Sequence, residues 1–386
     1  MDRTTERAEY LKLGAPAIGE EEIDELLDAI RSGWVTTGPK VAVLQERLEH
    51  YLRIPHVRCL SSCTAGLDLA LRLAGVAPGD EVLVPAMTFA SCANVVEHLG
   101  AQPVLVDCRP DTGLIDLDHA AAHVSTRTVA LMPVHLGGHP VDLDAVNAFR
   151  DRHGVAVVED AAHAIGAEWR GRRIGAHGNP TSFSFHATKN ITTFEGGALA
   201  LADGAAAERV QRLSLHGLSR SAWSRHDTRA PAGYELFEPG LKCAMHDVAA
   251  AVGIHQLARL DGWIAQRGQL AGAYDERLGD LPLELPPRPP AHARHAHHLY
   301  MVGVREDAPQ SRDELLDALH RGRIGASVHF KAIHLFAYYR DRYGLRPADL
   351  PVASDRSARA LSLPLHPAMT ADDVDDVVAV LEEALA

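Results

Sequence analysis

One lysine stands apart in the segment SFSFHATKNITTFEGGALA, which covers residues 182–200. Lys189 lies between an alternating aromatic stretch and a glycine pair, with no other lysine or arginine in the segment. Exposed lysines usually occur among mixed charges, and buried strands usually exclude them. A lysine in a partly desolvated pocket has a lowered pKa and can attack a carbonyl group to form a Schiff base. The segment therefore indicates a nucleophilic lysine.

Two acidic residues end a predicted buried strand in VAVVEDAAHA, residues 155–164. Burying a carboxylate costs free energy unless the group has a cationic partner, so Asp160 could face a protonated ring nitrogen. The alternative is that the carboxylate caps a following helix. His163 comes three residues later, one helical turn on, and could face the same cavity or be an ordinary surface histidine.

The segment SSCTAG, residues 61–66, follows a predicted strand and opens a predicted helix. Free amides at the start of a helix bind anions, although any strand–helix unit offers something similar. The sequence has no GxGxxG or GxxxxGK loop, so the usual dinucleotide and nucleoside-triphosphate sites are not expected. Phe89 follows the predicted strand at Glu81–Val84 and could belong to the core or stack on a flat ligand.

Pyridoxal phosphate is the cofactor that uses this whole set of groups. Its aldehyde needs a lysine, its phosphate needs backbone donors and a hydroxyl, and its ring nitrogen needs a carboxylate that keeps the nitrogen protonated. Four separate features of the sequence therefore agree on one ligand.

Composition favours a cytoplasmic enzyme or binding protein. The 386 residues suit one large domain with a smaller one. The charged N-terminus MDRTTERAEYLKLG is unlike a signal or an anchor, and no apolar run approaches the length that crosses a bilayer. Five cysteines without metal-type spacing favour a reducing compartment, and a formal charge of −13 argues against nonspecific nucleic-acid binding.

Strands and helices alternate between residues 56 and 160, and the strands are almost continuously apolar. This pattern indicates a mostly parallel sheet with helices on both faces, in which ligands bind at the carboxyl ends of the strands. One-face apolar spacing also predicts an earlier helix over Glu20–Ser32.

The last third of the chain predicts a smaller α+β domain. A helical stretch from His246 to about Leu278 leads to predicted strands at LYMVGV and ASVHF and to a C-terminal helix capped by Thr370. We place the boundary after residue 253. This gives a large domain over 1–253, which includes the N-terminal helix, and a small domain over 254–386.

The chain resembles the DegT/DnrJ/StrS sugar aminotransferases, which are fold-type-I pyridoxal-phosphate enzymes acting on nucleotide-linked keto sugars. The resemblance covers nearly the whole sequence. It is carried by IGEEEIDELLDAIRSGWVTTGPKV, SSCTAGLDLAL, VEDAAHAIGAEWRGRRIG, SFHATKNITTFEGGA, LSLHGLSRSAW, GASVHFKAIHL and LSLPLHPAMT. It implies an α/β fold with a seven-stranded, mostly parallel sheet between helices, and a smaller α+β C-terminal domain. It also implies a homodimer with its active site at the subunit interface.

The resemblance assigns roles to individual residues. Lys189 would carry the cofactor and move protons, and Asp160 would pair with the pyridine nitrogen. Ser184 would help hold the phosphate. The full set of expected cofactor residues is Thr64, Ala65, Phe89, Asp160, His163, Ser184 and Lys189, with Phe89 stacked on the ring and His163 at its other face or its hydroxyl. The expected reaction moves an amino group, from glutamate, to a keto sugar on a nucleotide diphosphate.

The substrate residues rest on weaker features. Ser327 and His329 in GASVHF resemble a pattern of members that aminate the C4 position. Candidates for the substrate diphosphate are Arg220, Lys242, Arg323 and Lys331, although surface ion pairs are the commoner role of such residues.

One position departs from the family pattern. Relatives commonly read GYKYNM where this chain reads GLKCAM, residues 240–245, so Ala244 replaces an asparagine that helps bind the phosphate of the neighbouring subunit. Lys242, His246 or water could compensate for it.

Other functions are compatible with parts of the sequence. The histidines of HARHAHHLY, residues 292–300, suggest a metal, but a metal site usually takes ligands from more than one segment, so we expect none. A keto-cyclitol aminotransferase, a pyridoxal-dependent sugar dehydratase and a non-catalytic regulatory paralogue are the alternatives. Dehydratase relatives replace the lysine with histidine, so Lys189 speaks against that activity. A shared fold does not determine which nucleotide the substrate carries, or whether amination takes place at C3 or at C4 of the sugar.

Overall fold

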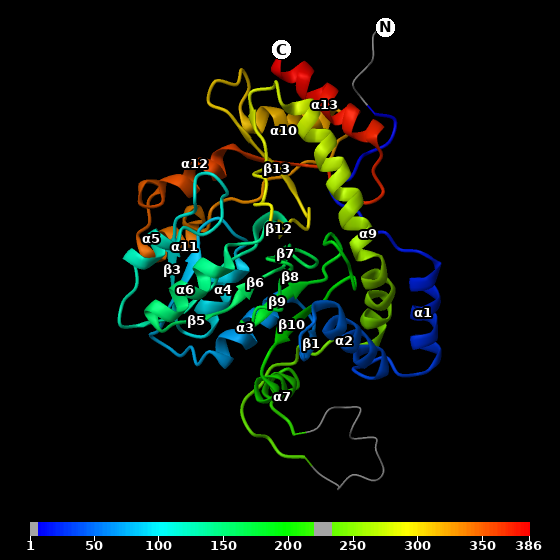
Figure 1. Cartoon of the computed structure of the whole chain (residues 1–386), viewed down its shortest axis with the longest axis vertical. Coiled ribbons are helices and arrows are strands. Elements are labelled where there is room, and N and C mark those ends of the chain that lie inside the picture. The colour runs from blue at the N-terminus through cyan, green and yellow to red at the C-terminus, as the bar shows by residue number, and fades with distance from the viewer. Residues whose placement is uncertain (1–6, 220–233) are drawn as a thin grey trace.

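The computed structural model describes residues 7–219 and 234–386, and a β-sheet flanked by helices lies at its centre (Figure 1). Its strands are β1 (His56–Leu60), β2 (Glu81–Pro85), β3 (Gln102–Val106), β4 (Thr128–Leu131), β5 (Ala156–Val157), β6 (Glu159–Asp160), β9 (Thr181–Ser184) and β10 (Gly197–Leu201).

Two four-stranded sheets, β1-β10-β9-β6 and β3-β2-β4-β5, make up this centre. Because β5 and β6 are consecutive parts of one extended segment, and Val134 after β4 bridges Asp160 in parallel, they form one seven-stranded sheet within the described residues. Strand β10 is antiparallel to β1 and β9, and the other pairs are parallel. The expected mostly parallel α/β sheet is confirmed.

Helices cover both faces of the sheet. Leu83 of β2 points into one core cluster, whereas Val82 and Val84 point into the other. Burial on both faces is the reason that these strands read as apolar runs. The first cluster includes α2 (Pro39–Leu52), α5 (Leu117–Ala122), α6 (Leu143–His153) and the start of α9 (Asp247–Leu278), and the second includes α3 (Cys63–Leu73), α4 (Ser91–His98) and α7 (Gly204–Leu213).

Helix α9 connects this part to a smaller α+β unit, as Figure 1 shows. Its side chains up to Ile264 join the first core cluster, and those from Leu270 join a third cluster. The boundary after residue 253 falls inside this continuous helix and stays a prediction. The third cluster lies among α10 (Arg312–Arg321), α13 (Ala371–Leu385) and the antiparallel strands β11 (Leu283–Glu284), β13 (Tyr300–Val304) and β14 (Ala360–Leu363).

Short elements complete the fold. Strands β7 (Glu168–Trp169), β8 (Arg172–Arg173) and β12 (Ala293–Arg294) form a small antiparallel sheet, and α11 (Ala337–Tyr343) and α12 (Pro351–Arg359) follow the segment at 326–330. Thr370 caps α13 in a capping box with Asp373, as expected. In the part of the chain that the structure describes, no helix has the length and apolarity to span a membrane.

The expected strand at ASVHF, residues 326–330, is wrong. Only Ser327 forms a bridge there, with Ser362 of β14. His329 instead contacts Ser362 through its side chain, Nδ1 to Oγ at 2.9 Å, and the chain then enters a 3₁₀ turn at Ile333–Leu335. The alternation of the segment therefore reflects a loop with one side on β14.

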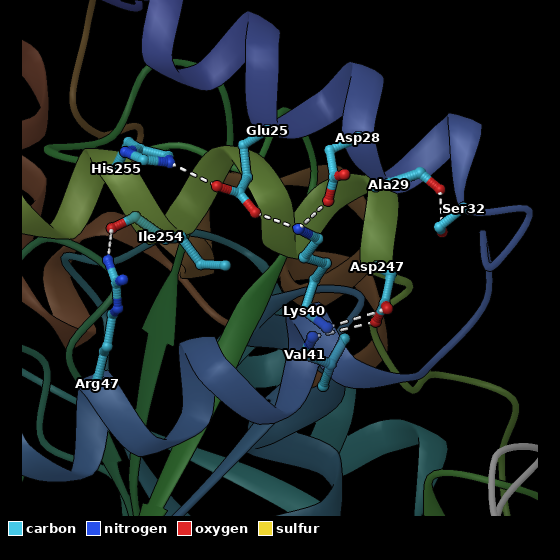
Figure 2. A network of polar contacts seen from close by, with 10 residues as sticks. All are labelled: Glu25, Asp28, Ala29, Ser32, Lys40, Val41, Arg47, Asp247, Ile254 and His255. Atoms are coloured by element: carbon cyan, nitrogen blue, oxygen red, sulfur yellow. Dashed lines mark hydrogen bonds and ion pairs between the residues drawn. The ribbon is translucent and has the colours of Figure 1, made fainter.

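Asp247, the first residue of α9, holds the start of α2. Its buried carboxylate accepts hydrogen bonds from the amides of Gly38, Lys40 and Val41 at 2.8, 3.0 and 3.1 Å, and Figure 2 draws those of Lys40 and Val41. These amides belong to the helix start, where no intrahelical acceptor exists. An anion there also interacts favourably with the helix dipole.

The same junction includes α1 (Glu20–Arg31). Lys40 of α2 forms ion pairs with Glu25 and Asp28 of α1, and His255 of α9 contacts Glu25 at 2.9 Å (Figure 2). Arg47 donates to the carbonyl of Ile254 at 3.2 Å. Helices α1, α2 and α9 are thus joined by polar contacts as well as by their core.

Replacing Asp247 by alanine should lower the free energy of unfolding of the cofactor-free protein by about 1–3 kcal/mol, because three amides lose their acceptor in a buried place. Asp247→Asn should recover part of the loss, since its amide oxygen can still accept. Urea unfolding measures both. Asp24→Ala, at an exposed position of α1, is the control, and an equal loss there would contradict the capping role.

Candidate active site

Lys189 lies in the loop between β9 and β10 and is half-buried. Its neighbour Asn190 fixes the loop, because the Asn190 amide nitrogen donates to the carbonyl of Ala296 at 2.7 Å and its oxygen contacts His298 Nδ1 at 3.1 Å. Burial lowers the pKa of Lys189 from 10.5 to about 8, and the charge of Asp160 offsets part of this shift. A substantial fraction of this amine is therefore neutral near pH 8.

Asp160 ends β6 in a buried position, and its two carboxylate oxygens have separate donors. Oδ1 accepts from the Ala162 amide at 2.9 Å and from Cys63 Sγ at 3.7 Å, and Oδ2 accepts from Cys92 Sγ at 2.9 Å. A turn follows β6, so the helix-cap alternative and the spacing of one helical turn to His163 are wrong. The carboxylate lies where the sheet ends and influences the charge on Lys189.

Thr64 and Ala65 are in the first turn of α3, as expected. The Ala65 amide donates to Oγ of the cap residue Ser62 at 3.1 Å, which leaves the earlier amides of the turn as the helix's free donors. Gly197 of β10 lies against this turn, since a Cβ there would be 2.4 Å from the carbonyl carbon of Ser62. Ser184 is paired with Gly197 across the strands. Ser184 and the start of α3 are thus both neighbours of Gly197.

His163 is buried and neutral. Its Nδ1 accepts from the Gly137 amide at 3.1 Å, so the neutral ring carries its hydrogen on Nε2. Burial holds its pKa well below the usual histidine range, and the charges of Lys189 and His329 act in the same direction. The ring of Phe330 stacks with His163 at 5.9 Å.

Phe89 lies in the loop after β2 and is 60% exposed, so it does not belong to the core. Its ring is 6.0 Å from the ring of Phe330. Aromatic side chains from three segments therefore border the lysine side of the sheet, and the exposed face of Phe89 fits a flat ring. With the carboxylate, the helix start and the lysine, the residues present fit pyridoxal phosphate.

His329 is also within electrostatic reach of Lys189. Burial, together with the charge of Lys189, lowers the pKa of His329 to about 4. Ser327 lies two residues before it and bridges the same strand residue, Ser362. The structure thus brings the expected pair to the border of the lysine site.

The basic candidates for a diphosphate are spread over several elements. Lys242 is exposed just before α9, the ammonium of Lys331 is 5.1 Å from the centre of the Phe336 ring, and the carbonyl of Arg323 accepts from the Leu11 amide at 2.9 Å. Arg220 lies outside the described residues. No contact joins these three described residues to one another, so within 7–219 and 234–386 they form no cluster.

Ala244 lies beside the phosphate-binding candidates of its own chain. It bridges Leu60 at the end of β1, and its amide donates to Ser214 at 3.1 Å. Its methyl group supplies no hydrogen bond in place of the asparagine of relatives.

The sequence analysis missed three residues at the site. Cys63 and Cys92 donate to Asp160, and the ring of His298 packs on His163 at 4.5 Å. The one signal for them in the sequence is that Cys63 stands inside SSCTAG, directly before Thr64. Among the described residues, no group of three or more histidine, cysteine or acidic side chains is arranged to hold a metal ion.

Loading of pyridoxal phosphate onto the cofactor-free protein should speed up about tenfold per pH unit below pH 8 and level off above it, because the neutral amine of Lys189 is the nucleophile. Stopped-flow absorbance measures this rate. In Asp160→Asn the midpoint should move below that of the wild type, since the charge that raises the pKa of Lys189 is lost. A wild-type midpoint near 10.5 would contradict the desolvated lysine.

Comparison with known proteins gives a consistent result. The model of the DegT/DnrJ/EryC1/StrS aminotransferase family matches residues 16–382. The spore coat polysaccharide biosynthesis protein SpsC of Bacillus subtilis (strain 168) is 42% identical over 379 residues, which are 98% of this chain and 97% of the relative.

Solved structures agree in fold over nearly the full length. The putative sugar aminotransferase Spr1654 from Streptococcus pneumoniae, in its PMP-form, has a TM-score of 0.90 and 32% identity over 96% of this chain and 99% of its own. Its PLP-form has a TM-score of 0.89, and the match covers 98% of this chain and 100% of the PLP-form chain. DesV of S. venezuelae has a TM-score of 0.86 and 33% identity over 94% of both chains. The chain belongs to the DegT/DnrJ/EryC1/StrS aminotransferase family.

Proposed function

We propose that the protein transfers an amino group from glutamate to a keto sugar carried on a nucleotide diphosphate, at the C4 position. The chain is a pyridoxal-phosphate-dependent sugar aminotransferase of this family, and the proposal adds the donor, the nucleotide and the position. The observation that carries the proposal is the half-buried Lys189, whose pKa is lowered to about 8, beside the buried carboxylate of Asp160.

Each expected cofactor residue has a role that its surroundings support. The first turn of α3 at Thr64 and Ala65, with the Ser184 hydroxyl, would hold the phosphate. Phe89 would cover one face of the ring with its exposed side, and His163 would offer its Nε2 hydrogen to the other face or to the ring hydroxyl. Because Ser62 already engages the Ala65 amide, we expect Thr64 to be the main donor in that turn.

Proton movements would be divided between two groups. When bound, the pyridoxal group supplies an electron sink for charge at the substrate carbon. Asp160 would hold a proton at the ring nitrogen through its ionised carboxylate. Lys189, once the amino donor has displaced it, would remove the proton at the substrate carbon and return it as general base and then general acid. Its lowered pKa suits both directions near neutral pH.

Several observations support the sugar substrate. SpsC is a polysaccharide biosynthesis protein by name, and Spr1654 is a putative sugar aminotransferase. His329, neutral at physiological pH, could exchange hydrogen bonds with a sugar hydroxyl without adding charge, and Ser327 supports the C4 assignment. Lys242, Lys331 and Arg220 remain candidates for the diphosphate.

The assembly and the compartment are part of the same proposal. We infer a homodimer with the active site at the subunit interface, because the family pattern places a phosphate ligand there. We infer a cytoplasmic location, supported by five cysteines that are all free. Sedimentation of the loaded protein tests the dimer.

Purified wild-type protein should show a visible absorption band of lysine-bound cofactor that borohydride removes and that glutamate converts to the amine form. Lys189→Ala should lose the borohydride-sensitive band, because its side chain has no amine. Lys12→Ala, at an exposed lysine outside the site, is the control and should match the wild type. Failure of the wild type to bind supplied cofactor would overturn the proposal and favour a regulatory paralogue.

Amination of a nucleotide-linked 4-keto sugar, followed by mass spectrometry, should give a product that is aminated at C4. Turnover of keto cyclitols but not of nucleotide sugars would overturn the nucleotide assignment, and loss of a hydroxyl without gain of nitrogen would indicate a dehydratase. His329→Ala should raise KM more than it lowers kcat, since its proposed contact is with the substrate sugar.

A further inference from the structure

Two thiols bracket the carboxylate of Asp160. Cys92 Sγ, in the first turn of α4, is 2.9 Å from Oδ2, and Cys63 Sγ, at the start of α3, is 3.7 Å from Oδ1. All three side chains are buried. Thiols from two different helices thus hold the carboxylate at the end of the sheet in place.

Both thiols act as donors here. An ionised carboxylate only accepts, so each S–H must point to Asp160. Burial and the charge of Asp160 hold the pKa of both cysteines well above the usual thiol range, which keeps them protonated. Thr88 Oγ1 is 3.3 Å from Cys92 Sγ and, because the thiol hydrogen is used, its hydroxyl donates to the sulfur.

The strength of a donor decides how much negative charge the carboxylate keeps. A thiol is a weak donor and a hydroxyl a stronger one. Hydrogen bonds to the ionised form lower a carboxylate's proton affinity, so weak donors orient Asp160 while leaving most of its charge available. Among the described residues, the Ala162 amide, at 2.9 Å from Oδ1, is the remaining donor to this carboxylate.

We propose that Cys63 and Cys92 are positioning residues that orient Asp160 and set how strongly it holds a proton at the cofactor's ring nitrogen. The proposal rests on the proposed role of Asp160. Among the described residues, the titratable groups that face this centre include Asp160 from β6, Cys63 from α3, Cys92 from α4 and, around Lys189, His163, His298 and His329.

The two cysteines change the titration through the charge on Asp160, and this determines the direction in which each variant shifts the midpoint pH. In Cys92→Ala the carboxylate loses a donor, its charge becomes more concentrated, and nearby protonated nitrogens become more stable. The midpoint pH of the absorbance titration of the lysine-bound cofactor should therefore rise. In Cys92→Ser a stronger donor returns, so the midpoint should fall to the wild-type value or below it.

The experiment is this titration on the loaded enzyme, with the single-turnover rate with glutamate measured on the same samples. We expect midpoints in the order alanine, cysteine, serine from high to low, with a spread on the order of half a pH unit. We also expect Cys92→Ala to slow the half-reaction by on the order of tenfold, because the carboxylate of Asp160 loses a contact that orients it, and Cys92→Ser, which restores that contact, to recover most of the rate. The Cys63 pair should show the same order with smaller shifts, because its sulfur is farther from the carboxylate.

Cys108→Ala is the matched control, because this cysteine is buried in the same core cluster as Cys63 and Cys92 and contacts a different part of the chain. Midpoints of the Cys92 and Cys63 variants equal to that of Cys108→Ala would overturn the proposal, as would a serine variant above the wild type. If Cys92→Ala does not fold, the Cys63 series gives the same test.

Asp160→Asn separates the two hypotheses. A lowered midpoint in Asp160→Asn together with unmoved cysteine variants would overturn only the thiol proposal. An unmoved midpoint in Asp160→Asn would overturn the role of Asp160 itself.

Discussion

The site depends on one electrostatic compromise, an amine and a carboxylate that are both withdrawn from water at the end of a sheet. Burial lowers the pKa of Lys189 and the charge of Asp160 restores part of it. Neither group would be tolerated there alone, because an isolated buried charge is costly. The sheet order, the loop after β9 and the helix starts on both faces all serve to keep these two groups close and partly dry.

The backbone, as well as the side chains, arranges the site before a ligand binds. The start of α3 reaches the strands only because position 197 has no Cβ, and the Ser62 cap then orders the first turn before any ligand arrives. The Gly137 amide likewise fixes the tautomer of His163. A site arranged in this way needs little reorganisation when an anion and a flat ring enter.

Much of this could be read from the sequence. Apolar strand runs and one-face helical spacing predicted most elements of the sheet domain, and the segments around Lys189, Asp160 and Thr64 predicted the ligand. The rest depends on distance in space. Nothing local tells that Cys92 meets Asp160, 68 positions away. The strand expected at 326–330 failed because its alternation fits a loop against β14 equally well. The basic residues expected to bind the diphosphate do not form a cluster among the described residues. A sequence shows that these residues are charged but not where each side chain points.

Helix α9 belongs to the cores of both the large part of the fold and the small unit. At 32 residues it is about 48 Å long. Asp247 pins one end to α2, and the other end belongs to the small unit that carries Ser362 and, through it, His329. The helix packs into the first core cluster as far as Ile264, so a tilt would begin beyond that residue. From Ile264 to Leu278 it rises about 21 Å, and a tilt of one degree would displace its end by about 0.4 Å. A displacement of the small unit would therefore reach His329 through its contact with Ser362.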